Sequence, residues 1–231
     1  MNSPEEREPL APRPGLRLPL DILIAPRHAF ATIAATGEWL PSALIVVGVY
    51  VLVGSVLLAA ATAHVAMLQP LAGASPVSFA ERLQRARIEA PIFYITSLLF
   101  QWVWSGLILA VVSRQGPGGF GLYFAAAVNA TLPIALEDLV AATIVAAHGA
   151  EHYHSFAGLV LALPDSLAMF RPGGGLQELG FLASFSLGTL WNALLLAYAL
   201  VYIGGVRLLT ALVTSFTLLL AFALLHTVLP G

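Results

Sequence analysis

Cysteine and lysine are absent from this chain, and charged residues are scarce, at 10% of its 231 positions. The lack of cysteine excludes disulfide bonds and thiolate chemistry. The scarcity of charge excludes an ordinary soluble domain, in which roughly 25% of residues are charged. A formal net charge of −2 argues against nucleic-acid binding, because such proteins carry a basic surface. All ten basic residues are arginine, and together with the many alanines this bias favours a GC-rich, bacterial genome.

Long apolar runs take the place of charge: 59% of the residues are hydrophobic and the mean hydropathy is +0.89. A helix of about 20 apolar residues crosses a hydrocarbon core about 30 Å thick. Four runs reach that length without Asp, Glu, Lys or Arg: residues 42–63, 92–113, 181–203 and 208–229. A fifth run, 120–147, is long enough but contains Glu137 and Asp138. The sequence therefore predicts an all-α, polytopic membrane protein, a bundle of five transmembrane helices with short interfacial helices.

The first residues differ in composition from the rest of the chain. Residues 1–20 are rich in proline and acidic residues and lack the apolar core of a signal peptide, so we expect a disordered cytoplasmic tail. Residues 21–231 then form the membrane domain. Within it, Pro26 is predicted to open a short helix at the membrane surface, with Trp39 at headgroup level before the first span.

Two loops between the spans are expected to hold short helices. In the first, Ser78 and Glu81 form a capping-box pattern ahead of a short charged helix. The second loop, residues 148–180, includes an apolar stretch, 155–170, that is too short and too interrupted to span. We expect that stretch to be re-entrant or interfacial.

The distribution of arginine predicts the orientation, since cytoplasmic loops carry more basic residues than outside loops. With the N-terminus inside, the cytoplasmic set is Arg7, Arg13, Arg17, Arg27, Arg114 and Arg207, and the outside set is Arg82, Arg85, Arg87 and Arg171. The larger inside set favours a cytoplasmic N-terminus and an outside C-terminus, in a bacterial cytoplasmic membrane.

A polar stripe marks the third predicted span. Asn129, Pro133 and Glu137 are spaced four apart, on one side of a helix, and Asp138 lies about 100° round the axis from Glu137. Pro133 has no N–H to donate to the carbonyl of Asn129, so the helix should kink and leave that acceptor free. A carboxylate at mid-bilayer costs at least about 2.5 kcal/mol, so both acids must face protein, water or each other.

This stripe has two interpretations. The first is functional: a proton or ion relay, or a binding cavity at the kink. The second is structural: the two acids are neutral when buried, or they lie near the membrane interface. Gln101 in span two and Asn192 in span four are candidate hydrogen-bond partners, because polar contacts commonly join membrane helices.

His148, Glu151 and His152 fit the H-x-x-E-H pattern of inverted zinc peptidases. On a continued helix the two histidines would share a face and could chelate a cation, with Glu151 as the base. Gly149 weakens such a helix, and no further cluster supplies an evident third ligand. We therefore expect no metal, no cofactor and no catalytic residue, and keep a metal-dependent hydrolase as an alternative. The isolated histidines, expected to be packed or interfacial, are His28, His64 and His226.

Three segments resemble the Yip-domain family, the Ypt/Rab-interacting five-span membrane proteins and their bacterial relatives. "PRHAFATIAATGEWLPSAL" is similar to the family's opening, "NATLPIALEDLV" to its Leu-Pro segment, and "FSLGTLWNALLLAYAL" to its fourth span. The residues that carry the resemblance are Pro26, Arg27, Phe30, Trp39, Leu132, Pro133, Leu190 and Trp191. Ser186 and Gly188 stand where the family tends to have an acidic residue and phenylalanine.

The resemblance covers roughly residues 22–225 and implies a five-helix bundle with a cytoplasmic N-terminus. Our functional prediction is a non-enzymatic membrane protein that organises or recruits partners in the bilayer, either another membrane protein or further copies of itself. The alternatives are a small-molecule or ion permease at the kink of span three, and the hydrolase at His148, Glu151 and His152.

Overall fold

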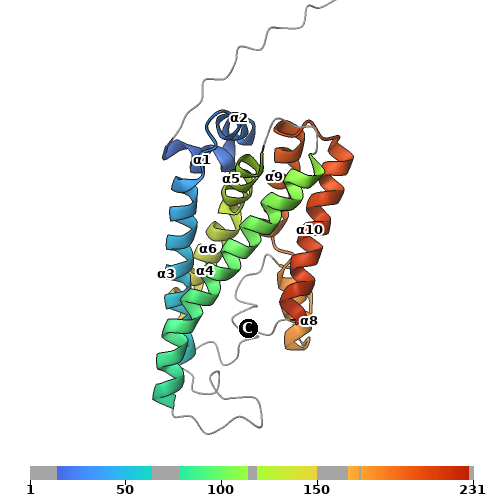
Figure 1. Ribbon diagram of the computed structural model, residues 1–231. Coiled ribbons are helices and arrows are strands. Elements are labelled where there is room, and N and C mark those ends of the chain that lie inside the picture. The colour runs from blue at the N-terminus through green and yellow to red at the C-terminus, as the bar shows by residue number, and fades with distance from the viewer. Residues whose placement is uncertain (1–14, 64–78, 114–118, 150–165, 172, 229–231) are drawn as a thin grey trace, which may run out of the picture.

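The computed structural model describes residues 15–63, 79–113, 119–149, 166–171 and 173–228 (Figure 1). Over these residues every regular element is a helix, which confirms the predicted all-α class. The elements are α1 (Arg17–Ile24), α2 (Pro26–Thr36), α3 (Leu40–Ala63), α4 (Phe79–Val112), α5 (Phe120–Ala130), α6 (Leu132–His148), the 3-10 turn η3 (Leu167–Phe170), α8 (Leu176–Ala183), α9 (Leu187–Tyr202) and α10 (Leu208–Val228).

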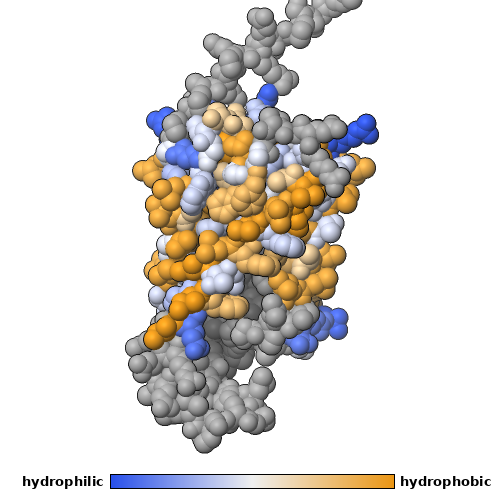
Figure 2. Space-filling view, in the orientation of Figure 1, coloured by the Kyte–Doolittle hydropathy of each residue, from blue (hydrophilic) through white to orange (hydrophobic). Residues whose placement is uncertain are grey.

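Three helical stretches are long and apolar enough to cross a membrane: Pro91–Val112, Phe120–His148 and Leu208–Leu225. Two further pairs of helices are long and apolar enough only when each pair is taken together, and both pairs are bent: by 118° between α2 and α3 and by 51° between α8 and α9. The described residues thus hold three candidate spans, or up to five if each bent pair is one span. Figure 2 shows apolar residues over the middle of the visible face and hydrophilic ones toward its ends. A multi-pass membrane protein fits this arrangement, and the count of five stays a prediction.

Helices α1 and α2 close one end of the bundle, called the N-terminal end below (Figure 1). Gly37, at φ 66°, ends α2 in the left-handed conformation that suits glycine, and α3 turns sharply away. Helices α3, α4, α5–α6, α9 and α10 then run along the bundle in alternating directions. The starts of α5 and α10 therefore lie at the N-terminal end, and the starts of α4 and α8 lie at the opposite end.

The N-terminal boundary differs from the prediction. Helix α1 begins at Arg17, inside the segment 1–20 expected to be tail, because Leu18 and Ile22 are fully buried against the bundle. Residues 1–14 lie outside the described residues. The helix predicted to open at Pro26 is present, but its apolar residues Phe30 and Ile33 are buried in the bundle rather than laid on a membrane surface.

Two further expectations about the spans were wrong. Helix α4 continues through Pro91, so the short helix and the second span are one element; the predicted cap at Ser78 lies outside the described residues. The fourth span, expected to be continuous over 181–203, is broken between Ala183 and Leu187. Ser186 stabilises the start of α9 after the break, because its hydroxyl and the Thr189 side chain form a capping box there. Most of the apolar stretch 155–170 lies outside the described residues.

Small residues set the spacing of the central helices. Ala125, Ala126 and Ala127 on α5 are buried, and a Cβ added to Gly106 on α4 would lie only 2.9 Å from the Cα of Phe124. Helices α4 and α5 therefore touch backbone to backbone at Gly106, as helices in membranes commonly do at glycine.

Candidate functional site

The third span breaks at Thr131, near the place where the proline predicted a kink. Helix α5 ends at Ala130 and α6 begins at Leu132, with Pro133 in its first turn. Proline has no N–H and restricts the residue before it, so the hydrogen-bond ladder cannot continue unbroken. The backbone acceptors at the break must find partners outside the helix.

Asn129, just before the break, is fully buried and makes three hydrogen bonds. Its amide nitrogen donates to the carbonyl oxygens of Ala125, at 2.8 Å, and Glu38, at 3.1 Å. Its amide oxygen accepts from the Ser42 hydroxyl on α3 at 2.5 Å. Asn129 therefore joins α5 to the sharp turn between α2 and α3.

The next two residues are held by two other helices. The carbonyl of Ala130 accepts a hydrogen bond from the Asn192 side chain on α9, at 2.7 Å. The hydroxyl of Thr131 accepts from the indole of Trp102 on α4, at 3.0 Å. We call residues 129–131 with Ser42, Trp102 and Asn192 the junction cluster. Asn192 is the interhelical partner proposed from sequence, whereas Gln101 makes no side-chain hydrogen bond to the described residues of this cluster.

Glu137, one turn further along α6, contacts the start of α9. Its carboxylate accepts a hydrogen bond from the backbone N–H of Gly188, in the first turn of that helix. A helix N-terminus carries partial positive charge, so it stabilises a carboxylate there. The contact requires glycine, because a Cβ at position 188 would collide with the Glu137 carboxylate and lie 3.0 Å from the carbonyl oxygen of Pro133.

Asp138 points to a different neighbour. The Asp138 carboxyl group lies near the Tyr50 hydroxyl on α3. The ring of Tyr94 on α4 lies beside Tyr50, with centroids 6.3 Å apart. We call Tyr50, Tyr94, Glu137, Asp138 and Gly188 the carboxylate row; it joins α6 to α3 on one side and to α9 on the other.

The predicted polar stripe is thus divided between two sets of partners. Asn129 and Pro133 belong to the junction cluster and its break, while Glu137 and Asp138 belong to the carboxylate row. Both acids are half-buried. Each carboxyl group faces protein groups. Protein is one of the three environments expected for a carboxylate inside a bilayer, where exposure to lipid would cost free energy.

The histidine pattern is only partly described. His148 is exposed at the end of α6, and its Nδ1 lies 2.9 Å from the carbonyl oxygen of Ile144 in its own helix. Glu151 and His152 lie outside the described residues. Among the described residues there is no group of three or more His, Asp or Glu side chains that could hold a metal ion.

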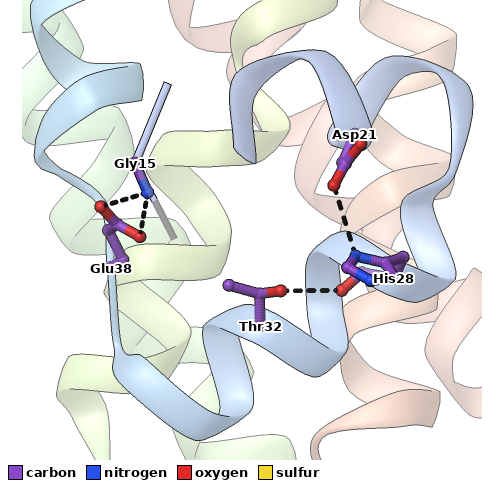
Figure 3. Close-up of polar contacts among 5 residues, drawn as sticks. All are labelled: Gly15, Asp21, His28, Thr32 and Glu38. Carbon is purple, nitrogen blue, oxygen red and sulfur yellow. Dashed lines mark hydrogen bonds and ion pairs between the residues drawn. The ribbon is translucent and has the colours of Figure 1, made fainter. Parts of the chain in front are cut away.

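A second polar set lies at the N-terminal end (Figure 3). Asp21 on α1 pairs with His28 on α2, at 3.3 Å, and the carbonyl of His28 accepts a bond from Thr32 at 3.2 Å. Both carboxylate oxygens of Glu38 accept from the backbone N–H of Gly15, at 2.9 Å each. These contacts fasten α1 to α2 and to the turn before α3.

Some of the residues that carry the Yip resemblance serve packing in this fold. Phe30 is fully buried and its ring stacks on Tyr198 of α9, with centroids 5.7 Å apart. The Trp39 ring meets Phe124 edge-on at 5.4 Å. Leu132 and Pro133 are buried, whereas Arg27, Leu190 and Trp191 are exposed. An open hollow of about 420 Å³ lies between Trp39 and Phe120, away from the carboxylate row.

Comparisons with protein-family models, curated proteins and solved structures find no match to this chain. The resemblance to Yip proteins therefore rests on the quoted residues alone.

Sequence reasoning missed the partners of the polar residues. Ser42, Tyr50 and Trp102 are polar-capable side chains inside apolar spans, and such side chains are a usable signal. Gly188 gave a signal as well, since it departs from the family pattern at a position where α9 approaches Glu137.

Proposed function

We propose that this chain is a Yip-like multi-pass membrane protein that organises or recruits partners in the bilayer and has no catalytic activity of its own. The observation that carries the proposal is the use of its intramembrane polar groups. Asn129, Thr131 and Asn192 each form a direct hydrogen bond to another helix, Glu137 accepts one from the start of α9, and Asp138 lies near Tyr50 of α3. Groups held in this way build a rigid scaffold rather than a reacting centre.

The N-terminal end offers the surface on which a partner would be recruited. Helices α1 and α2 form a folded layer there, fixed by the Asp21–His28 and Glu38–Gly15 contacts. Three arginines are exposed at this end, Arg17, Arg27 and Arg207, while its two described carboxylates are engaged. This excess of basic residues supports our proposal that the N-terminal end is cytoplasmic.

Crosslinking in native membranes tests this function. The chain lacks cysteine, so a photoreactive crosslinker can be attached at one introduced site. We expect Ala35→Cys, exposed on α2 at the N-terminal end, to give a discrete adduct with a second copy or another membrane protein. Val213→Cys, 58% exposed on α10, is the matched control for lipid-facing positions. Failure to obtain an adduct from any exposed position on α1 or α2 would remove the proposal.

A permease is the second candidate, favoured by the carboxylate row. The row places two carboxyl groups and two tyrosines between α3, α4, α6 and α9. A series of ionisable side chains of this type relays protons in transporters. Wild-type protein in proteoliposomes should then move protons or a small cation, and Glu137→Gln should reduce that flux while Thr143→Val, on the exposed side of α6, leaves it unchanged. Absence of wild-type flux eliminates this candidate.

A further inference from the structure

Helix α1 is apolar on two opposite sides. Its inner side carries Leu18 and Ile22, which are fully buried. Its outer side carries Leu16, Leu20 and Ile24, which are 83%, 56% and 71% exposed. These three lie within about 80° of the helix circumference, because they are four residues apart on a repeat of 3.6. We call them the outer stripe. A surface of this kind in water would expose three large aliphatic side chains without a partner.

The outer stripe lies at the margin of the membrane-crossing helices. Helix α1 packs against α2 and against the start of α3 at the N-terminal end (Figure 1). The first turns of α3 expose Leu40, 55%, and Leu44, 65%, as lipid-facing residues do. Helix α1 therefore sits where the apolar belt gives way to the polar end of the molecule.

Exposed positive charge accompanies the stripe. Arg17 lies at the start of α1 and Arg27 lies three residues after its end, and both are exposed. The two described acids of this end have other partners: Asp21 pairs with His28, and Glu38 accepts from the backbone N–H of Gly15. Aliphatic residues flanked by exposed arginines match the boundary between acyl chains and anionic headgroups.

We propose that α1 is an interfacial anchor that inserts its outer stripe into the headgroup–acyl boundary, with Arg17 and Arg27 selecting anionic lipids. We assign this role to α1 and not to α2, because the large apolar residues of α2 are buried in the bundle. It is independent of whether the protein recruits partners or transports ions.

Fluorescence quenching in nanodiscs tests the anchor on the purified full chain. An environment-sensitive fluorophore is placed at Leu20→Cys in the outer stripe, or at Ala35→Cys on the exposed side of α2 as the reference. The quencher is an acyl-chain bromine carried on phosphatidylglycerol in one set of nanodiscs and on phosphatidylcholine in the other, at equal mole fraction. The position of the bromine is the same in both, so only the headgroup differs.

We expect the label at position 20 to be quenched by the lipid bromines and shielded from aqueous iodide, with the opposite result at position 35. Each arginine near an anionic surface raises local lipid binding about fivefold, so phosphatidylglycerol-borne bromine should quench position 20 preferentially. The double variant R17Q/R27Q, altered only at exposed residues, should lose that headgroup preference. R207Q, which changes an arginine of the α9–α10 turn, should keep it.

Three results would overturn the proposal. Iodide quenching at position 20 equal to that at position 35 would place the stripe in water. Shielding from both iodide and lipid bromine would mean that protein, either the chain's own N-terminal residues or a second copy, covers it. Equal loss of headgroup preference in R207Q and R17Q/R27Q would remove the role of the two arginines beside α1.

Discussion

Asn129 illustrates how one buried amide can hold three segments together. Its replacement by alanine leaves the Ser42 hydroxyl and the Glu38 carbonyl without their partner inside the bundle. Leaving buried polar groups unpaired costs about 1–3 kcal/mol, so we expect Asn129→Ala to lower the free energy of unfolding by that amount. The measurement is an unfolding titration with sodium dodecyl sulfate in mixed micelles.

The matched control is Ser55→Ala. Ser55 is exposed on α3 and, among the described residues, bonds to the Val51 carbonyl of its own helix, so its loss should change stability by less than about 0.5 kcal/mol. A double variant, Ser42→Ala with Asn129→Ala, should cost less than the sum of the two single variants. Strict additivity would show that the contact between Ser42 and Asn129 contributes nothing.

Gly188 is the second residue on which a contact depends. An added methyl group would meet the carbonyl of Pro133, which belongs to the backbone and cannot rotate away, so Gly188→Ala should destabilise the protein by about 1–3 kcal/mol. Shortening the neighbour, in Gly188→Ala with Glu137→Ala, should show a coupling of about 0.5–3 kcal/mol in the same titration. Gly180→Ala in α8, where nothing lies within 4 Å of the added Cβ, should instead be neutral or stabilising. Equal effects at both glycines would contradict the packing described here.

At this scale the sequence identified which polar residues matter but not what they touch. Asn129, Pro133, Glu137 and Asp138 stood out because each is expensive or disruptive inside an apolar helix. Their partners, Ser42, Gly188 and Tyr50, come from helices 50 to 90 residues away in the chain, roughly, as polar contacts between packed membrane helices do. Periodicity within one helix carries no information about which neighbour faces it.

Among the elements, the broken third span depends most on other helices. Its Ala130 carbonyl lies at the break and relies on the Asn192 side chain. Asn192→Leu removes that donor, so we expect the backbone amides around the break to exchange with solvent deuterium faster, by up to about tenfold for a loss of about 1.4 kcal/mol. Amides in the middle of α10 serve as the internal reference. Unchanged exchange at the break would show that this hydrogen bond does not stabilise it.

The helices were predicted well where the length of an apolar run determines their position, and poorly where packing against other helices determines it. Uncharged runs located α3, α4 and α10, because crossing a hydrocarbon core requires that length. The sequence did not reveal α1, because a helix of eight residues is stable only through the surface it buries. The break before α9 was missed because Ser186 and Thr189 were read as part of an apolar run rather than as a cap.

The whole molecule makes a prediction about sidedness. Alternating helix directions put Arg207 on the same side as α1 and α2 and put His148 on the other, and the ion pair with Glu178 at the start of α8 puts Arg171 beside that opposite end. Single cysteines at these positions should divide into two classes when intact cells are treated with a membrane-impermeant maleimide. With the N-terminal end cytoplasmic, positions 148 and 171 react and position 207 does not. Labelling of positions 148 and 207 from the same side would contradict the arrangement.

The contact between Phe30 and Tyr198 has a consequence for biosynthesis. The two rings stack although 168 positions separate them in the chain, and Phe30 is fully buried. A ribosome that adds 5–20 residues per second needs roughly ten to thirty seconds to cover that distance. Helix α2 is therefore made long before its docking site on α9 exists. During that interval Phe30 lacks the aromatic partner that it has in the folded protein, and a chain that stops before α9 never acquires it.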